Sequence, residues 1–435
     1  MNSDLIEIYN AAIKSVVPNC LINNVLKIEN ESLCISNFKY PLSEGKIWVV
    51  GAGKASALMA QSIENLLLEN IAGGCIIVKY KHICALQKVQ IIEAGHPTPD
   101  ENSLIGSTLI KKIVQQADKN DLIICLWSGG GSALLTDVPE GIQLNDIIQL
   151  NNSLLRCGAT INETNAVRKH LSLLKGGQLA KMASPTRVLN LLLSDVVGDL
   201  PDVIASGPAT ADPTTYENAL WVLEKYALTD EISPSILTYL KEGIEGKHQE
   251  TVKAHNPVFD RVHEYIIGNN NIALEAAAKK AETLGYETLI LSDAMQGEDI
   301  EVTEYILQTA IDFKKERMSG QSLCLLMGGE TTVKVEGNGK GGRNQHSALF
   351  AAMMLQNRPK ISFLAAGTDG TDGPTDAAGA WADHTTLENA LTAGIDPLKS
   401  FRECDSYTFF EKVDGLLITG PTFTNVMDLK IVLVR

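Results

Sequence analysis

The sequence predicts a two-domain α/β protein, with a doubly wound N-terminal domain and a smaller C-terminal α/β domain built on a mixed sheet. The chain has 435 residues, more than one hydrophobic core usually supports. Short β-rich runs alternate with helical patterns through its first half, as in crossover units around a mostly parallel sheet. A polar stretch at 243–257 ends that pattern, so we expect domains over residues 1–250 and 258–435.

The elements of the first domain follow in order. Strands are expected at 46–50, 75–80, 121–127 and 188–194, and helices up to about Glu69, near 102–118, and over 143–157 and 162–174. In the second domain, strands at 265–268 and 287–292 flank a helix over 272–285, and another helix spans about 299–318. Residues 323–337 are expected to form a strand that bends into a second one, and strands at 362–370, 415–420 and 429–435 complete the sheet.

The composition excludes several classes of partner. Lys and Arg total 37 against 52 Asp and Glu, a net charge of −15, so the field of the protein repels nucleic acid and membrane lipid. The eight cysteines include no CxxC pair, which fits free thiols in a reducing compartment. No signal-peptide pattern and no apolar run of about 18 residues occurs. We expect a soluble cytoplasmic protein, and a homodimer stays open.

Two glycine-rich loops follow expected strands of the first domain. VVGAGKASALMAQSIE (49–64) places Gly51, Gly53 and Lys54 between a strand and a helix, where backbone amides and the helix dipole favour an anion. Lys54 opposes that dipole, so it either pairs with an anion or is a solvated lysine. The second loop, in CLWSGGGSALL (125–135), is expected to bind a phosphate or carboxylate, or to be a tight turn that Ser132 caps. Its residues are Ser128, Gly129, Gly130, Gly131 and Ser132.

Basic side chains mark two further stretches. Arg168 lies on an expected helix and either faces a substrate or, with Lys169 and Lys175, complements the C-terminal end of that helix. In GGETTVKVEGNGKGGRNQ (328–345), Gly328, Gly329 and Glu330 end a strand of the buried type. Residues 331–339 are expected to form a solvated hairpin, and Arg343 begins a helix where phosphate binding is favoured.

Carboxylates follow two other expected strands. Asp195 comes directly after the run 188–194, at the carboxyl end where open α/β sheets bind their ligands. Asp369 and Asp372 belong to AAGTDGTDGPTDAAGAWAD (365–383), where Asp-Gly pairs form turns or several like charges share a cation. The spacing is not that of an EF-hand, so we expect Mg²⁺ bound with nucleotide phosphates at Asp369 and Asp372, with Asp195 as the alternative ligand.

Taken together, these stretches resemble the class II glycerate 2-kinase family over nearly the whole chain. The matching segments are VVGAGKAS, AGHPTPDENS, WSGGGSALL, NAVRKHLSLLKGGQLA, LLLSDVVGDLPDVIASGP, GGETTV with GKGGRNQ, and GTDGTDGPTDAAGA. The resemblance implies a Rossmann-like N-terminal domain, a C-terminal MOFRL domain and a site in the cleft between them. It implies that the γ-phosphoryl of ATP passes to the 2-hydroxyl of D-glycerate with Mg²⁺, and that Lys54, Asp195 and Arg343 are the catalytic residues.

One segment departs from the family pattern. Where a sequence like TGPTGTNVND is expected, this chain reads TGPTFTNVMD, with Phe423 and Met427 in place of a small and a polar residue. If this loop contacts nucleotide or substrate, the departure bears on affinity.

Two alternatives remain. An NAD(P)H-dependent hydroxypyruvate reductase is one, because the strand–Gly-Ala-Gly–helix start resembles a dinucleotide site and members of the family have carried that label. Ser56 at the third glycine position and the basic end of the next strand (79–81) weaken it. The same loop is not a phosphate-binding P-loop either, because Trp48 and Ala55 stand where that motif requires Gly and Ser or Thr. The other alternative is a non-catalytic sensor of phosphorylated metabolites.

Overall fold

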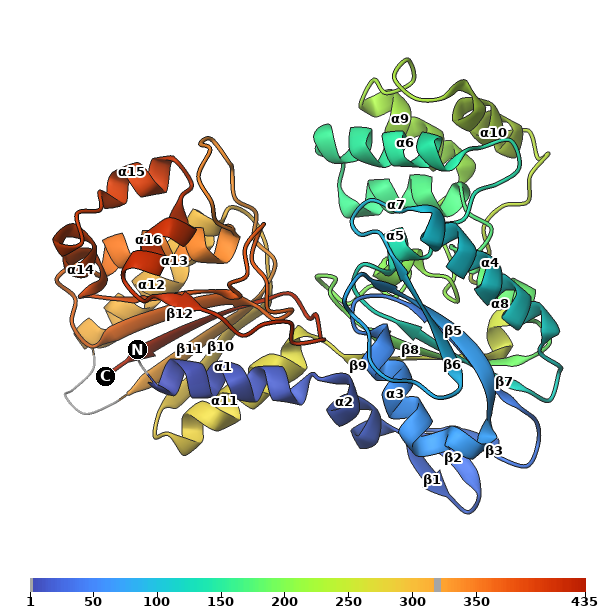
Figure 1. Cartoon of the computed structure of the whole chain (residues 1–435), viewed down its shortest axis with the longest axis horizontal. Coiled ribbons are helices and arrows are strands. Elements are labelled where there is room, and N and C mark those ends of the chain that lie inside the picture. The colour runs from blue at the N-terminus through green and yellow to red at the C-terminus, as the bar shows by residue number, and fades with distance from the viewer. Residues whose placement is uncertain (1–2, 317–321) are drawn as a thin grey trace. The chain divides into compact units, whose positions relative to one another are not determined.

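The structure, a computed structural model, describes residues 3–316 and 322–435 and contains two compact α/β units (Figure 1). We call Leu21–Ser194 with Asp199–Ile267 the N-terminal unit, and Met1–Cys20, Asp195–Gly198 and Gly268–Arg435 the C-terminal unit. The chain therefore leaves each unit and returns to it. The predicted two-domain α/β class is confirmed.

The N-terminal unit is built on a six-stranded sheet of order β6-β5-β4-β7-β8-β9. The strands are β4 (Ile47–Ala52), β5 (Ile71–Lys79), β6 (Val89–Ala94), β7 (Leu122–Trp127), β8 (Arg187–Leu193) and β9 (Val262–Gly268). The pairs from β6 to β8 are parallel. All residues of β7 are buried, as expected for a parallel strand covered on both faces.

The order of these strands reverses at one point. The chain lays β5 and β6 on one side of β4 and then returns to place β7 on the other side. In open α/β sheets, ligands bind beyond the carboxyl ends of the strands at such a reversal. A ligand site is therefore expected at the carboxyl ends of β4 and β7.

Helices complete this unit. A helical layer of α6 (Leu144–Arg156), α7 (Ile161–His170), α9 (Tyr216–Lys225) and α10 (Pro234–Ile244) packs around an apolar core of its own (Figure 1). The remaining helices are α2 (Pro18–Val25), α3 (Ser56–Leu67), α4 (Glu101–Gln116), α5 (Gly131–Leu134) and α8 (Gln178–Ala183), and 3₁₀ turns lie at Leu68–Asn70, Ile204–Ser206 and Pro257–Arg261. A small antiparallel sheet consists of β1 (Lys27–Glu29), β2 (Ser32–Ile35) and β3 (Phe38–Pro41).

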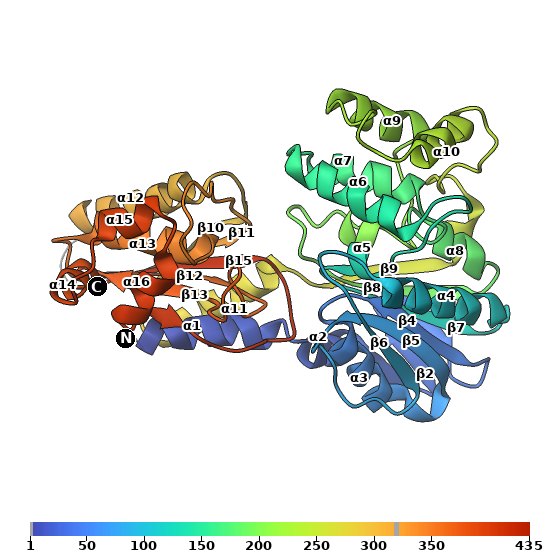
Figure 2. The same ribbon diagram turned by 45° about the horizontal axis from the view of Figure 1, so that its top comes forward.

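The C-terminal unit is a three-layer α/β/α sandwich on a mixed sheet of order β10-β11-β15-β12-β13-β14. Its strands are β10 (Glu287–Met295), β11 (Leu323–Gly329), β12 (Ile361–Gly367), β13 (Gly379–Asp383), β14 (Leu416–Leu417) and β15 (Asp428–Val434). Helices α12 (Asp299–Glu316) and α13 (Arg343–Leu355) cover one face, and α1 (Ser3–Ser15) and α11 (Asn270–Thr283) cover the other (Figures 1 and 2). Short helices α14 (Thr386–Thr392), α15 (Pro397–Arg402) and α16 (Ser406–Lys412) complete the unit.

Two details differ from the expectations, and one lies partly outside the described residues. Strand β9 joins the edge of the N-terminal sheet beside β8, although its sequence follows the polar stretch 243–257. The expected hairpin within 331–339 is wrong, because this segment is an irregular loop; Gly339 N donates to Glu403 O and Lys340 N to Asp405. The last residues of the helix expected at 299–318 lie outside the described residues.

Among the described residues, no single helix is long and apolar enough to cross a membrane, and α1 and α2 meet that test only as a pair bent by 52°.

Candidate functional site

The loops after β4 and β7 lie side by side at the reversal point of the N-terminal sheet. Lys54 N donates to Gly129 O at 2.9 Å, and Ala55 N donates to the buried Ser128 Oγ at 3.0 Å. Ser56 Oγ in turn donates to Leu126 O at 3.0 Å. These bonds hold the two predicted loops together as one structure.

Glycine is required in both loops. Gly53 has a φ of 144°, and a Cβ there would lie 2.1 Å from Ser128 Oγ. Gly130 has a φ of 84°, and a Cβ there would lie 2.9 Å from the His96 ring and 3.6 Å from Lys54 Cγ. Side chains would therefore block the approach of the loops and of His96 and Lys54. Lys54, Gly130 and His96 consequently meet at the carboxyl ends of β4 and β7.

The other small residues of these loops serve packing. Gly51 lies within β4, where a Cβ would be 2.2 Å from Leu126 O of β7. Gly131 begins α5, where a Cβ would be 2.6 Å from Ala205 Cβ. Both glycines therefore allow the backbones to approach closely and lie behind the surface at which Lys54 and Gly130 meet.

A strained turn at Ile204–Ser206 contacts the second loop. Ala205 and Ser206 have φ of 50° and 61°, although neither is glycine. Ser206 Oγ lies 2.8 Å from Ser132 Oγ and 2.9 Å from Asn165 Oδ1, so the turn connects α7 to the loop. Residues held in the left-handed region concentrate at functional sites.

Arg168 lies on α7 and lines a small cavity with Ser132. Its Nε donates to Asn151 Oδ1 at 2.8 Å, and burial lowers the pKa of its guanidinium to about 10. Its neighbour Lys169 has a different role, because its ammonium forms buried ion pairs with Asp202 at 2.8 Å and Asp212 at 3.2 Å.

In the C-terminal unit, Arg343 is held by two carboxylates. Its Nε and Nη2 donate to Asp428 at 2.6 and 3.0 Å, and its Nη1 lies 2.8 Å from Glu330 Oε1. Burial opposes the charge, but Asp428 and Glu330 raise the pKa of Arg343 above its usual value. The fork geometry holds the guanidinium in one orientation at the ends of β11 and β15.

Gly328 and Gly329 let this strand end pack tightly. A Cβ on Gly328 would lie 1.6 Å from Asn270 Oδ1, and one on Gly329 2.4 Å from the Met295 backbone. Asn270 donates to Val426 O at 2.7 Å and to Asp428 O at 3.1 Å, which fixes the start of β15. Both glycines therefore support the strand ends that carry Glu330 and Asp428.

Asp372 caps α13. Its Oδ1 accepts from Asn344 N at 3.1 Å and its Oδ2 from Gln345 N at 2.8 Å, and the side-chain amides of both residues add further bonds. Burial, with the charge of Asp428, raises the pKa of Asp372 to about 6 despite the amide donors and Arg343. The helix that begins at Arg343 is thus anchored by a carboxylate that lies 28 residues beyond Asn344.

Asp195 and Asp369 lie at the ends of β8 and β12. Asp195 Oδ2 accepts from Asn425 Nδ2 at 3.0 Å. Asp369 Oδ1 accepts from Thr371 N and Oγ1, both at 3.0 Å. Both carboxylates are only partly buried.

Asp195, Asp369 and Asp372 differ in whether they are available to bind Mg²⁺. Among the described residues, no three His, Cys, Asp or Glu side chains gather into a metal site. A Mg²⁺ ion carried by nucleotide phosphates requires only one or two protein carboxylates. Asp369 and Asp195 offer suitable oxygens, whereas Asp372 uses both of its oxygens on α13.

Three residues near these groups were not singled out from the sequence. Asp428 orients Arg343, His96 lies against Gly130, and Asn425 contacts Asp195. Asp428 and Asn425 stand in the quoted segment TGPTFTNVMD, and His96 in AGHPTPDENS, so the similarity of those segments to the family pattern was the available signal.

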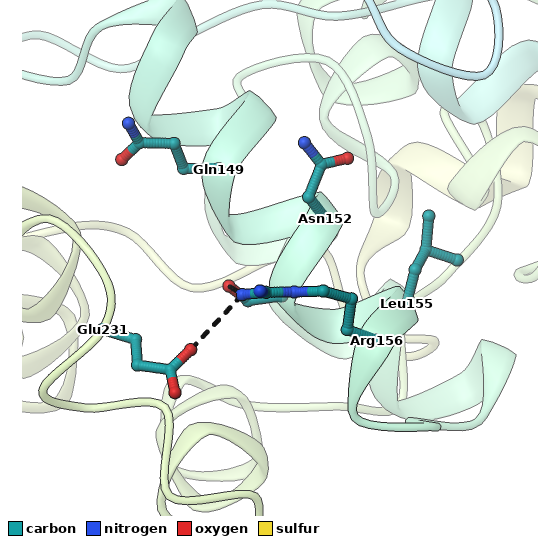
Figure 3. A pocket seen from close by; sticks show the side chains of 6 residues that line it. Gln149, Asn152, Leu155, Arg156 and Glu231 are labelled. Atoms are coloured by element: carbon teal, nitrogen blue, oxygen red, sulfur yellow. Dashed lines mark hydrogen bonds and ion pairs between the residues drawn. The ribbon is translucent and has the colours of Figure 1, made fainter.

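A wider hollow runs along α6, where Arg156 points toward Glu231 (Figure 3). This pair is 3.5 Å apart, and its side chains are 73% and 56% exposed. Leu155 beside it is also exposed. Ser153, the buried polar residue in its lining, already accepts from Arg156 Nη2 at 3.2 Å, and we assign the hollow no role.

Family comparisons match both halves of the chain. A family described as a domain of unknown function, DUF4147, matches residues 4–241. The MOFRL family matches residues 323–428. The two matches include Lys54 and Arg343 respectively.

Individual relatives cover nearly the whole chain. A glycerate 2-kinase of Pyrococcus horikoshii is 40% identical over 97% of this chain and 95% of its own length. A protein of Agrobacterium vitis named putative hydroxypyruvate reductase is 37% identical over 98% of this chain and 93% of its own. The crystal structure of a Thermotoga maritima glycerate kinase superposes with a TM-score of 0.86 at 38% identity, covering 100% of this chain and 99% of the other.

Proposed function

The chain belongs to the glycerate kinase family that joins a DUF4147 region to a MOFRL region, and from this premise we propose that it is an ATP-dependent glycerate 2-kinase. The proposed reaction transfers the γ-phosphoryl of ATP to the 2-hydroxyl of D-glycerate. The observation that carries the proposal is the meeting of Lys54 with two glycine loops where the strand order of the N-terminal sheet reverses.

This arrangement suits phosphoryl transfer. Such a reaction needs little covalent chemistry from the protein, but it needs positioning and neutralisation of the charge on the transferring group. Lys54 supplies an ammonium beside the loop amides, and Arg343 supplies a guanidinium in a fixed orientation. We propose that both cations act on the transferring phosphoryl.

Asp195 is proposed to orient or deprotonate the attacking hydroxyl. The amides of Gly129 and Gly130 would donate to phosphate or carboxylate oxygens, whereas Ser128 N already donates to Ala52 O at 3.2 Å. Mg²⁺ would be held by Asp369, with Asp195 as the alternative, and would neutralise phosphate charge when bound. Asp372 stays with α13 and is left out of this proposal.

The decisive experiment is an assay with ATP, Mg²⁺ and D-glycerate, followed by phosphorus NMR of the product. A 2-phosphoglycerate product is expected, and a 3-phosphoglycerate product would contradict the proposed position of transfer. Replacing Lys54 or Arg343 by Ala should lower turnover by about 10²-fold or more, because each removes one charge from the transition state.

Lys334→Ala provides the control within residues 328–345. This lysine is exposed and pairs with Glu336 at 2.7 Å, so its loss should leave turnover unchanged. Full activity in Lys54→Ala or Arg343→Ala would remove that residue from the catalytic set.

The name of the A. vitis relative favours one alternative, a hydroxypyruvate reductase. Ser56 Oγ is bonded to Leu126 O where a third glycine would stand, and β5 ends at Lys79 rather than at an acid that could hold a ribose. Rapid oxidation of NADH or NADPH in the presence of hydroxypyruvate would establish this alternative instead.

We further propose that the protein acts in the cytoplasm, since its eight cysteines are free.

A further inference from the structure

A small, partly open cavity lies within the N-terminal unit, beside Ser132 of the second glycine loop. Ser132 of α5, Asn151 of α6, Arg168 of α7 and Lys175 of the following loop contribute polar groups to its lining. Its volume is about 20 Å³, and a cavity of roughly 10–15 Å³ already holds one water molecule. The cavity therefore accepts one small polar group.

The charges around this cavity are unbalanced. Lys175 is only 4% exposed, and its ammonium donates to Leu135 O. Arg168 bonds to Asn151 through Nε. In the part of the chain that the structure describes, neither cation forms an ion pair with a carboxylate. Buried charges are normally paired, so this arrangement favours an added anion.

The one acid in the lining is already engaged. Asp137 Oδ1 accepts from Ser172 Oγ, and its Oδ2 accepts from Leu173 N at 2.6 Å. Burial lowers the pKa of Lys175 to about 8; Asp137 opposes this change and Arg168 adds to it. Arg168 and Lys175 thus share a cavity with one carboxylate, Asp137, which already accepts hydrogen bonds from Ser172 and Leu173. A bound anion would offset the repulsion between the two cations.

The position of the cavity connects it to the proposed reaction. Ser132, which lines the cavity, is two residues from Gly130, which lies against Lys54. Two residues span at most about 7 Å. A short hydroxy acid anchored in the cavity by one end can therefore keep its hydroxyl near Lys54.

We propose that Arg168 and Lys175 form the subsite that binds the carboxylate of the acceptor substrate. This inference rests on the proposed kinase function, and it names the part of the substrate that the subsite recognises. A guanidinium fork matches a planar carboxylate, and a small cavity suits a flat group with two oxygens better than a phosphate group with three terminal oxygens. Arg168 and Lys175 would thus select hydroxy acids over neutral polyols.

The test compares wild type with Arg168→Gln and Lys175→Met. Binding of D-glycerate and of its neutral amide, glyceramide, is measured by calorimetry without ATP, and KM is measured for both glycerate and ATP. Each variant should weaken glycerate binding and raise its KM about tenfold or more, because a charge-assisted hydrogen bond is lost. Glyceramide binding and the KM for ATP should change by less than about twofold.

Arg156→Gln is the matched control, because it removes an exposed arginine from α6, the helix that carries Asn151. Thermal melting identifies variants that fail to fold, and Arg168→Lys should recover part of the glycerate affinity if the charge matters. If Lys175→Met fails to fold, Arg168→Gln and Arg168→Lys decide the outcome.

The outcomes separate this inference from the proposed function. Turnover of glycerate with unchanged KM in folded variants would overturn the subsite and leave the kinase proposal standing. Charge-dependent binding of glycerate without turnover would support the subsite and overturn the kinase proposal. A loss confined to ATP would assign the cavity to a phosphate and overturn the inference, as would the absence of glycerate binding to wild type.

Discussion

Phe423 and Met427 adopt left-handed backbone conformations, with φ of 58° and 71°. These are the two positions at which the chain departs from the family pattern of Gly and Asn. Glycine and asparagine adopt this conformation readily, whereas bulky residues pay about 1–2 kcal/mol. The loop is held by its neighbours, since Thr424 Oγ1 donates to Val16 O and Asn425 contacts Asp195. The strain is therefore located beside a proposed catalytic residue.

Substitutions at position 423 should reveal this strain. Phe423→Gly and Phe423→Ala both remove the ring, but only glycine relieves the backbone. The Gly variant should be more stable than the Ala variant by about 1 kcal/mol in urea unfolding. Equal stabilities, or a more stable Ala variant, would show that the loop relaxes without strain.

The two partners of Arg343 should differ in their effect on stability. Asp428 is 1% exposed, whereas the side chain of Glu330 is 46% exposed. Asp428→Asn should lower the free energy of unfolding by about 2–3 kcal/mol, because it leaves the guanidinium and the buried Lys430 with less compensation. Glu330→Gln, which breaks an exposed pair, should cost about 0.5 kcal/mol or less. Chemical denaturation measures both, and equal costs would contradict the assigned difference.

Among the helices, α13 depends on a distant cap. Asp372 accepts hydrogen bonds from the first amides of α13 and keeps its proton up to about pH 6 in the folded protein. In the unfolded chain its carboxyl loses the proton near its ordinary pKa of about 4. The stability that this proton adds is therefore complete below about pH 4 and is lost as the pH rises through about 6.

Asp372→Asn removes this titration. Wild type should lose this contribution as the pH rises, whereas the variant should not. The free energy of unfolding of the variant minus that of wild type should therefore increase by about 2 kcal/mol from about pH 4.5 to pH 7, as measured by urea unfolding at both pH values. Asp376→Asn, in the same segment, removes an exposed carboxylate and serves as the control. Identical pH trends for the two variants would refute a special role for Asp372.

Over the molecule as a whole, the first helix belongs to the unit formed mainly by residues 268–435. Leu5, Ile8, Tyr9 and Ala12 form a buried stripe on α1 at helical spacing. Tyr9 OH donates to Gly367 O at 2.8 Å, at the end of β12. The stability of β15, which carries Asp428, and of β12, which Asp369 follows, thus depends on residues near the start of the sequence.

Ile8→Ala should therefore weaken the C-terminal unit selectively. A buried Ile→Ala change costs about 2–5 kcal/mol. Hydrogen exchange should accelerate in β11, β12 and β15 but change little in β4 and β7. Lys14→Ala, on the exposed side of the same helix, is the control. Equal loss of protection in both units would show that they unfold together.

The sequence by itself determined the class of the fold and most of its elements. The strands β4, β7 and β11 are continuous apolar runs, and β8 and β15 are largely apolar, so these strands are visible without knowledge of any partner. Lys54, Asp195 and Arg343 could be nominated in the same way, because each follows or begins an element recognisable from its own neighbourhood. Their catalytic roles remain proposals.

The tertiary structure alone decided the partners of these residues. Arg343 and Asp428 are 85 residues apart, Asp372 caps a helix that precedes it, and Arg168 and Lys175 share a cavity whose lining comes from four segments. The physical reason is that these contacts follow from strand order and helix packing, which bring distant segments together by burial of apolar surface. Local patterns reveal which residues form an element, but they do not specify which other element will lie against it.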